Sequence, residues 1–223
     1  MVLPVSYFDA HTHHAPANAD TVAVQNIIVG HDSHTPDDFS ACSVGVHPWY
    51  ANASSVQAHL DRVRQWAAHP RVWAIGECGL DRLNGPELSV QQAIFQEQIN
   101  ISQAVGKPLI VHSVRAFAEV VALRKPACQP WVLHGFNHRL LVLPLLLDAG
   151  FYVSLGAALL RPASPASTAI AHIPADKLLL ETDNHEVAIQ EIYEAAAIRL
   201  SMLSEALREQ VVKNARRVYL RRP

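Results

Sequence analysis

The sequence predicts an α/β fold of the (β/α)8 TIM-barrel type, slightly truncated. Eight short apolar runs alternate with helical or turn segments along the chain. Several runs are continuously apolar, such as residues 108–111, and this pattern is typical of parallel strands buried on both faces. No GxGxxG motif follows the first run and no GxxxxGK[ST] motif occurs, so the usual signals of the competing open, doubly wound sheet are missing from the sequence.

The expected elements follow from these patterns. We expect strands at residues 5–9, 24–29, 43–46, 72–76, 109–112, 131–134, 151–155 and 178–181. We expect helices at residues 55–68, 90–105, 140–149, 188–200 and 204–220. Helix 90–105 is the clearest, because its apolar side chains form one stripe and Gly106 stands where a terminating glycine belongs. The first two crossovers are short and carry Pro and Gly, so their helices should be stunted or missing.

Composition bounds the class of protein. The chain has 223 residues, of which 50% are hydrophobic and 17% charged, which fits one globular domain spanning residues 1–223. The net charge of −2 argues against holding a long nucleic acid by electrostatics alone, so a phosphate-bearing substrate must be bound locally, for example by metal ions.

Cysteine usage and apolar runs bear on the compartment. Three widely spaced cysteines without a CxxC pair argue against a disulfide framework and a thiolate zinc site. We see no basic and apolar leader and no apolar run of ~18 residues. We therefore expect a cytoplasmic protein without membrane association and without an obligate protein partner.

Metal-competent side chains stand at the C-terminal ends of five predicted strands. They are His11 and His13 after the first strand, Glu77 after the fourth, His112 at the end of the fifth, His134 at the end of the sixth and Asp183 after the eighth. In a (β/α)8 barrel these ends converge on one face, where the active site lies. The sequence therefore predicts that six side chains project into a single bowl.

The local motifs suit metal binding. His11 and His13 are two residues apart, so in an extended segment both imidazoles point to one side and can share a cation. Imidazole and carboxylate ligands together suit Zn, Mn, Fe, Co or Ni, and carboxylate with water also suits Mg. Glu77 lies in a GECGLD run whose glycines permit a sharp bend, and Asp81 could orient a ligand histidine. Taken singly, the HxH motif also fits solvated loop histidines, and Glu77 fits a helix N-terminal acid.

The motifs together resemble one family. FDAHTHH, GVHPW, AIGECGLD, KPLIVHS, LHGF, GFYVSLG and LLLETD occur in the order found in TatD metal-dependent hydrolases. The resemblance covers residues 8–183 and implies an amidohydrolase-type barrel, two divalent metals (Mg, Mn or Zn) and phosphodiester hydrolysis, typically of DNA. It also implies the ligands: His11, His13 and Asp183 for one metal, and Glu77, His112 and His134 for the other, with Glu77 bridging.

Roles in catalysis follow from this resemblance as hypotheses. Two cations can lower the pKa of a shared water to about 7, and the activated water attacks phosphorus. Asp183 would take up or relay the proton, so we predict Asp183 and Glu77 as catalytic residues. We predict His47, at the end of the third strand, and Arg115 as substrate-binding residues, with Arg82 as a weaker candidate for the same role.

The sequence also departs from the family pattern. Val114 interrupts the common His-Ser-Arg run, and Asn184 with His185 replaces the common Cys-Pro or Ala-Pro. The segments after His13 and after Asp81 are shorter than usual. These changes fall in loops that would contact substrate, while the metal ligands are intact.

Three functions remain open from the sequence. The first is a deoxyribonuclease or other phosphodiesterase acting on DNA or on a small phosphodiester. The alternative is an amidohydrolase-like lactonase, deacylase or deacetylase acting on a small molecule, which the slight acidity and trimmed loops would suit. The third is a non-catalytic binding module with a relict barrel, in which metal ligands should be lost, and none is.

Overall fold

The computed structural model describes residues 7–51, 54–124 and 129–220. These residues divide into two compact units, and each is described by itself. Of the described residues, the first unit contains 7–25 and 134–220, and the second contains 26–51, 54–124 and 129–133.

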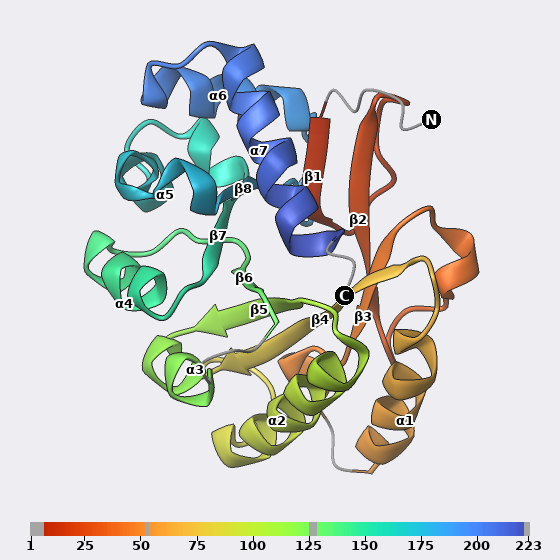
Figure 1. Cartoon of the computed structure of the whole chain (residues 1–223). Coiled ribbons are helices and arrows are strands. Elements are labelled where there is room, and N and C mark those ends of the chain that lie inside the picture. The colour runs from red at the N-terminus through yellow and green to blue at the C-terminus, as the bar shows by residue number, and fades with distance from the viewer. Residues whose placement is uncertain (1–6, 52–53, 125–128, 221–223) are drawn as a thin grey trace. The chain divides into compact units, whose positions relative to one another are not determined.

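The strands follow one another in chain order, β1 to β8, in one sheet (Figure 1). They are β1 (Tyr7–Thr12), β2 (Thr21–Ile28), β3 (Cys42–Gly45), β4 (Val72–Asp81), β5 (Leu109–Val114), β6 (Trp131–Leu133), β7 (Tyr152–Leu155) and β8 (Leu178–Leu180). All pairs whose register is described are parallel. This is the order expected of repeated β-α units.

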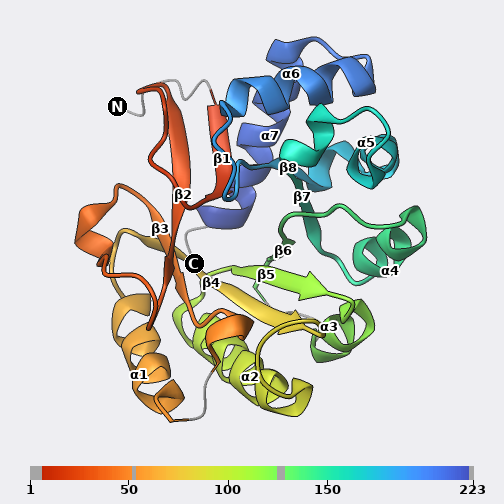
Figure 2. The ribbon, with the colours of Figure 1, turned by 180° about the vertical axis from the view of Figure 1, so that it is seen from behind.

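The first unit shows how the sheet closes. Strand β1 pairs with β2, β7 pairs with β8, and a parallel bridge joins Thr12 to Asp183, just after β8. The last strand therefore lies beside the first, which is the topology of a (β/α)8 barrel and excludes an open, doubly wound sheet. Helices α6 (Ile189–Leu200) and α7 (Ser204–Tyr219) lie against β1 (Figure 2). Their Tyr193 and Tyr219 hydroxyls donate hydrogen bonds to carbonyls of β1.

The second unit carries β3 to β6 with two helices packed together, α1 (Val56–Ala67) and α2 (Leu88–Val105) (Figure 1). Two buried glutamines of α2 hold the ends of strands. The Gln98 amide accepts from the Val46 N–H at 2.8 Å and donates to the Val46 carbonyl at 3.0 Å. Gln91 does the same for Asp81, at 2.7 and 2.9 Å. Each amide thus replaces a missing sheet partner for a buried strand end.

The remaining helices are short. The α-helices are α3 (Phe117–Leu123), α4 (Leu143–Asp148) and α5 (Pro165–Ala169). The 3-10 helices are η1 (Pro36–Asp38), η2 (Pro48–Tyr50), η3 (Leu140–Val142), η4 (Ala157–Leu160), η5 (Ile170–His172) and η6 (Ala175–Lys177). Between β1 and β2 the described residues contain no helix, and between β2 and β3 they contain only η1, so the predicted truncation of the first crossovers is confirmed.

The structure also corrects several expected boundaries. Strand β1 runs on to Thr12 and β4 to Asp81, so His11 and Glu77 lie inside strands and not after them. Strand β5 runs on to Val114, so His112 lies inside it and not at its end. The predicted helix 140–149 is divided into η3 and α4, and α3 and α5 were not predicted. Gly106 ends α2 with φ 69°, as expected. The first two residues of the predicted strand 5–9 lie outside the described residues.

No helix among the described residues is long and apolar enough to cross a membrane. Cys42 and Cys78 are buried free thiols, while Cys128 lies outside the described residues.

Candidate metal centre

The first unit brings together His11, His13 and Asp183. Both imidazoles place Nε2 3.6 Å from the same carboxylate oxygen, Oδ1 of Asp183. One ligand atom of each residue lies within 4.8 Å of the others. Two ligands of one tetrahedral ion, each about 2.1 Å from it, lie about 3.4 Å apart. The donor types and their spacing therefore fit a divalent cation held by all three residues.

The backbone fixes this cluster. The Asp183 N–H donates to the His11 carbonyl at 2.9 Å, and the Asp183 carbonyl accepts from the His13 N–H at 3.0 Å. Asp183 adopts φ 53°, the left-handed conformation, which aspartate tolerates better than most residues. The segment after β8 is thereby tied to β1 at the HxH motif, so the carboxylate is held on the same side as the two imidazoles.

A buried polar network lies behind the cluster. The Asp9 carboxylate accepts from the Thr182 N–H at 3.0 Å and from its hydroxyl at 2.6 Å, and that hydroxyl lies 2.8 Å from the Thr12 hydroxyl. Burial raises the pKa of Asp9 to about 7, although the hydrogen bonds from Thr182 oppose the shift. Asp9 thus supports the residue that precedes Asp183. A cavity of about 380 Å³ in this unit is lined by Asp9, Thr12, Thr182 and His185, among others.

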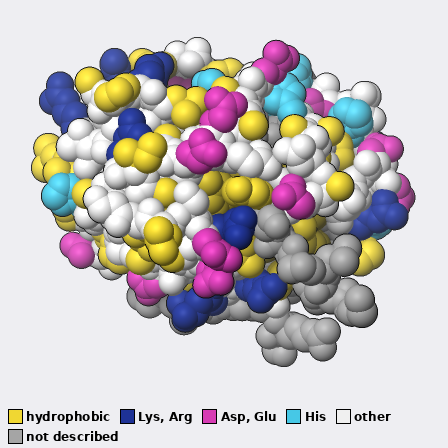
Figure 3. Space-filling model, turned by 90° about the horizontal axis from the view of Figure 1, so that it is seen from above, with side chains coloured by type: hydrophobic (Ala, Val, Ile, Leu, Met, Phe, Trp, Pro, Cys, Tyr) yellow, Lys and Arg dark blue, Asp and Glu magenta, His cyan; other side chains and the backbone are white. Residues whose placement is uncertain are grey.

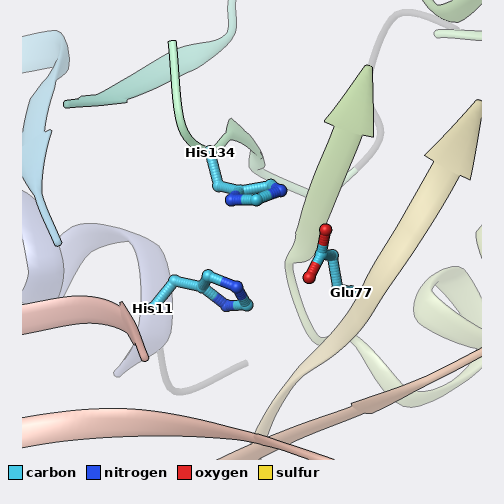
Figure 4. A group of neighbouring side chains, drawn as sticks. All are labelled: His11, Glu77 and His134. Carbon is cyan, nitrogen blue, oxygen red and sulfur yellow. The ribbon is translucent and has the colours of Figure 1, made fainter. Parts of the chain in front are cut away.

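His134 belongs to the same unit. Its ring lies 4.6 Å from that of His11, centroid to centroid (Figure 4, which also draws Glu77 of the second unit). The buried Glu181 carboxylate lies 3.5 Å from His134 Nδ1 and accepts from the Gly135 N–H at 2.5 Å. Glu181 therefore faces the Nδ1 edge of the His134 ring.

The second unit brings Glu77, His112 and His47 together. Glu77 Oε1 lies 2.8 Å from His112 Nδ1 and 3.0 Å from His47 Nε2. One ligand atom of each residue lies within 4.8 Å of the others. Glu77 and His47 are almost fully buried, so these contacts are shielded from water. One carboxylate and two imidazoles again form a donor set that can hold a divalent cation.

The tautomer of His47 follows from its other contact. His47 Nδ1 accepts from the Trp49 N–H at 3.2 Å, so the ring proton belongs on Nε2, which then donates to Glu77. In this arrangement His47 orients the carboxylate. Its predicted contact with substrate stays a prediction.

Asp81 orients His112 from the opposite side. Asp81 Oδ2 lies 3.3 Å from His112 Nε2 and accepts from the Trp49 indole N–H at 2.5 Å. Burial raises the pKa of Asp81, but the hydrogen bonds from Trp49, the Leu83 N–H and His112 outweigh it, so the pKa lies below its usual value. An ionised Asp81 carboxylate only accepts, so it favours the proton on Nε2 of His112. The Nδ1 lone pair would then face Glu77 Oε1 at 2.8 Å, an arrangement that requires a cation bound to both atoms.

Close backbone packing positions Glu77. Its N–H donates to the buried Asn26 side chain at 2.8 Å, and Asn26 also accepts from Ser43 at 2.9 Å. Gly79, with φ 144°, lies so near β5 that a Cβ there would be 2.0 Å from the His112 carbonyl oxygen. The expectation that glycines in this motif allow a close approach is confirmed at this position.

The other predicted site residues are less constrained. Arg115 is exposed directly after β5, with φ 53°. Arg82 forms an ion pair with Glu119. His185 is exposed. The substrate-binding role of Arg115 stays a prediction.

Sequence reasoning missed several supporting residues. Asn26 stands inside an apolar strand run, and Gln91 and Gln98 stand on the buried face of a helix that was interpreted only by its apolar stripe. The available signal was a polar residue at a strand or helix position whose neighbours in the pattern are apolar, because a buried polar side chain usually has a hydrogen-bond partner. Glu181 and Asp9 belong to the quoted motifs LLLETD and FDAHTHH, but their roles depend on contacts that only the structure supplies.

The fold is a barrel, and two clusters of histidine and carboxylate side chains that could hold a metal ion lie at the C-terminal parts of its strands. A profile described as "TatD related DNase" matches residues 31–220. The chain therefore belongs to the TatD family.

Curated relatives agree with this assignment. The "3'-5' ssDNA/RNA exonuclease TatD" of Edwardsiella piscicida is 34% identical over 152 residues, which cover 66% of this chain and 58% of that protein. The metal-dependent hydrolase YcfH of Escherichia coli K12 is 37% identical over 151 residues, which cover 66% of this chain and 56% of that protein. The matched region thus spans less than two thirds of either relative's length.

Solved structures show the same fold. The crystal structure of YJJV, a TatD homologue from Escherichia coli K12, superposes with a TM-score of 0.85 and 19% identity, covering 99% of this chain and 100% of that one. A TatD family hydrolase from Entamoeba histolytica gives a TM-score of 0.72 at 18% identity, covering 80% and 74%. The predicted (β/α)8 fold is confirmed.

Proposed function

We propose that this chain is a divalent-metal-dependent phosphodiesterase that acts on single-stranded nucleic acid. His11, His13 and Asp183 hold one cation, and Glu77, His112 and His134 hold a second, with Glu77 shared. The single observation that carries the proposal is the spacing of His11 and His13 about one oxygen of Asp183, 3.6 Å on each side.

Cations bound there would acidify a water and offset negative charge on the phosphate. The side chains supply the rest. Asp183 is half-buried at its cluster, so its outer oxygen can take up the proton lost by the attacking water. His47 and Asp81 act as positioning residues, because they fix Glu77 and the tautomer of His112.

One observation supports a nucleic-acid substrate, and a second indicates that such a substrate would be bound at the site itself. One relative carries the name of an exonuclease for single-stranded DNA and RNA. The net charge is −2, and on the face drawn in Figure 3 Lys and Arg side chains lie in separate places among acidic and hydrophobic ones. Substrate phosphates would then be held chiefly by the metal sites, with Arg115 as an additional contact.

The test compares Glu77→Ala and His112→Ala with a matched surface variant, His172→Ala, whose imidazole is exposed on η5. Each purified protein is stripped of metal, reloaded with Mg²⁺, Mn²⁺ or Zn²⁺, and assayed on end-labelled single-stranded DNA. We expect turnover to fall to background in the first two variants and to stay at the wild-type level in the third. Circular dichroism checks that each variant is folded.

Full activity of reloaded Glu77→Ala or His112→Ala would refute the ligand assignment. A wild-type protein that cleaves simple esters or amides but neither DNA nor bis-nitrophenyl phosphate would refute the phosphodiesterase proposal. That result would instead favour the lactonase or deacylase alternative on the same metal centre.

A further inference from the structure

We propose that Trp49 is a stacking platform for a nucleobase of the substrate, next to the His112 end of the metal centre. The inference rests on the proposed function, because it names how the substrate strand is held there. None of the roles assigned above to the metal ligands or to Asp81 requires an exposed aromatic face at this position.

Trp49 combines exposure with fixed orientation. It lies in η2 between buried Pro48 and half-buried Tyr50, and 48% of its surface is exposed. Here both polar hydrogens are used: the indole N–H donates to Asp81 at 2.5 Å, and the backbone N–H donates to His47 at 3.2 Å.

The indole is also next to the site chemistry. Its ring lies 4.9 Å from that of His47, at 85°, and 6.0 Å from that of His112, at 79°. Both contacts are edge-to-face, and the same Asp81 oxygen that accepts from the indole faces His112 Nε2. The Trp49 indole is therefore held next to the ring of His112, a proposed metal ligand.

This arrangement suits a nucleobase better than other ligands. A phosphate held at the metal centre places its flanking base a few Å away, and a rigid indole offers that base a flat apolar face. Stacking of this kind accepts every base, because each base has a π-face. It also needs no cluster of basic side chains, in keeping with a chain of net charge −2.

A purely structural role makes a different prediction. If Trp49 only donates its N–H to Asp81, then losing that N–H should be the damaging change. Trp49→Phe removes the N–H and keeps an aromatic face, whereas Trp49→Leu removes both. Trp66→Leu, on α1, is the control for loss of a tryptophan elsewhere in the same unit.

The experiment measures kcat and KM on two short single-stranded DNA substrates with identical phosphates. One carries normal bases at its last two positions, and the other carries tetrahydrofuran residues without bases. We expect wild type, Trp49→Phe and Trp66→Leu to favour the normal substrate by about 5- to 100-fold in kcat/KM, as stacking of one base allows. We expect Trp49→Leu to lose this preference through a higher KM on the normal substrate alone.

Equal losses on both substrates in Trp49→Leu, or loss of the preference in Trp49→Phe, would overturn the stacking role. A second readout covers the case in which wild type cleaves neither substrate and the proposed function fails. Tryptophan fluorescence is titrated with phosphorothioate versions of the two strands, which resist cleavage. Stacking on Trp49 is supported if only the normal strand quenches the fluorescence and if this quenching is absent in Trp49→Phe. It is refuted if the two strands quench equally or if neither quenches.

Discussion

Asp81→Asn removes one negative charge and keeps the shape of the side chain. In the structure Oδ2 faces three donors, the Trp49 indole, His112 Nε2 and the Asn84 side-chain amide, and Oδ1 faces the backbone N–H groups of Leu83 and Asn84 at 2.7 and 3.1 Å. An asparagine has one acceptor and one donor end, so in either flip at least two of these donors face an NH₂ group. In the flip that places the NH₂ group at the Oδ2 position, His112 loses the acceptor that keeps its proton on Nε2.

The expected magnitudes follow from those contacts. Loss of an outer-shell carboxylate behind a histidine ligand weakens metal affinity about 10- to 100-fold. Burying two donors without acceptors lowers the free energy of unfolding by about 2–4 kcal/mol. Isothermal titration of the metal-stripped protein with Mn²⁺ measures the first quantity, and urea unfolding measures the second. Asp61→Asn, on an exposed aspartate of α1, is the control and should change neither by more than the error.

An Asp81→Asn protein that is less stable but binds Mn²⁺ with wild-type affinity would refute the orienting role. Asp81 would then serve only to hold its own loop. Weaker Mn²⁺ binding together with unchanged binding in the control variant is the result that the geometry requires.

Three further predictions concern the second unit. Gly79→Ala should unfold or severely destabilise the protein in urea, because its Cβ would lie 2.0 Å from the His112 carbonyl oxygen, and near-native stability would contradict this packing. Gln98→Leu should lower the free energy of unfolding by about 2–4 kcal/mol, since both Val46 backbone groups lose their partner, and a smaller change in calorimetry would show that water replaces it. Burial raises the pKa of the Cys42 thiol from 9.0 to about 12. In a variant whose other two cysteines are replaced, the folded protein should therefore react with a thiol reagent at pH 8 about a thousandfold more slowly than the urea-unfolded protein. Equal rates in the two states would contradict the burial of Cys42.

The fold was predictable from sequence because it depends on local patterns, and the same patterns gave the candidate ligands. A buried parallel strand needs a continuous apolar run, and each run survives as one of the eight strands. Side chains near the C-terminal ends of barrel strands face the active-site end of the barrel, so His11, Glu77 and Asp183 could be proposed as ligands from their position. The strand ends were less predictable, since β4 extends through GECGLD, whose polar and glycine residues do not resemble a strand.

The supporting contacts were not predictable in the same way. Gln98 and Asn26 are buried because particular backbone groups, at Val46 and Glu77, need partners, and those needs arise only when distant segments pack. Likewise the tautomer of His47 depends on the backbone of Trp49, which no residue pattern specifies. Sequence thus identified the residue types that can hold a metal, and the structure supplied the hydrogen bonds that orient them.

The central claim is that two cations share Glu77. The most direct measurement is electron paramagnetic resonance of the metal-stripped protein reloaded with Mn²⁺, together with elemental analysis. If two cations share Glu77, we expect two Mn²⁺ ions per chain with a spectrum of exchange-coupled ions, replaced in Glu77→Ala by signals of uncoupled Mn²⁺. A single bound ion, or two ions without coupling in the wild-type protein, would contradict the claim.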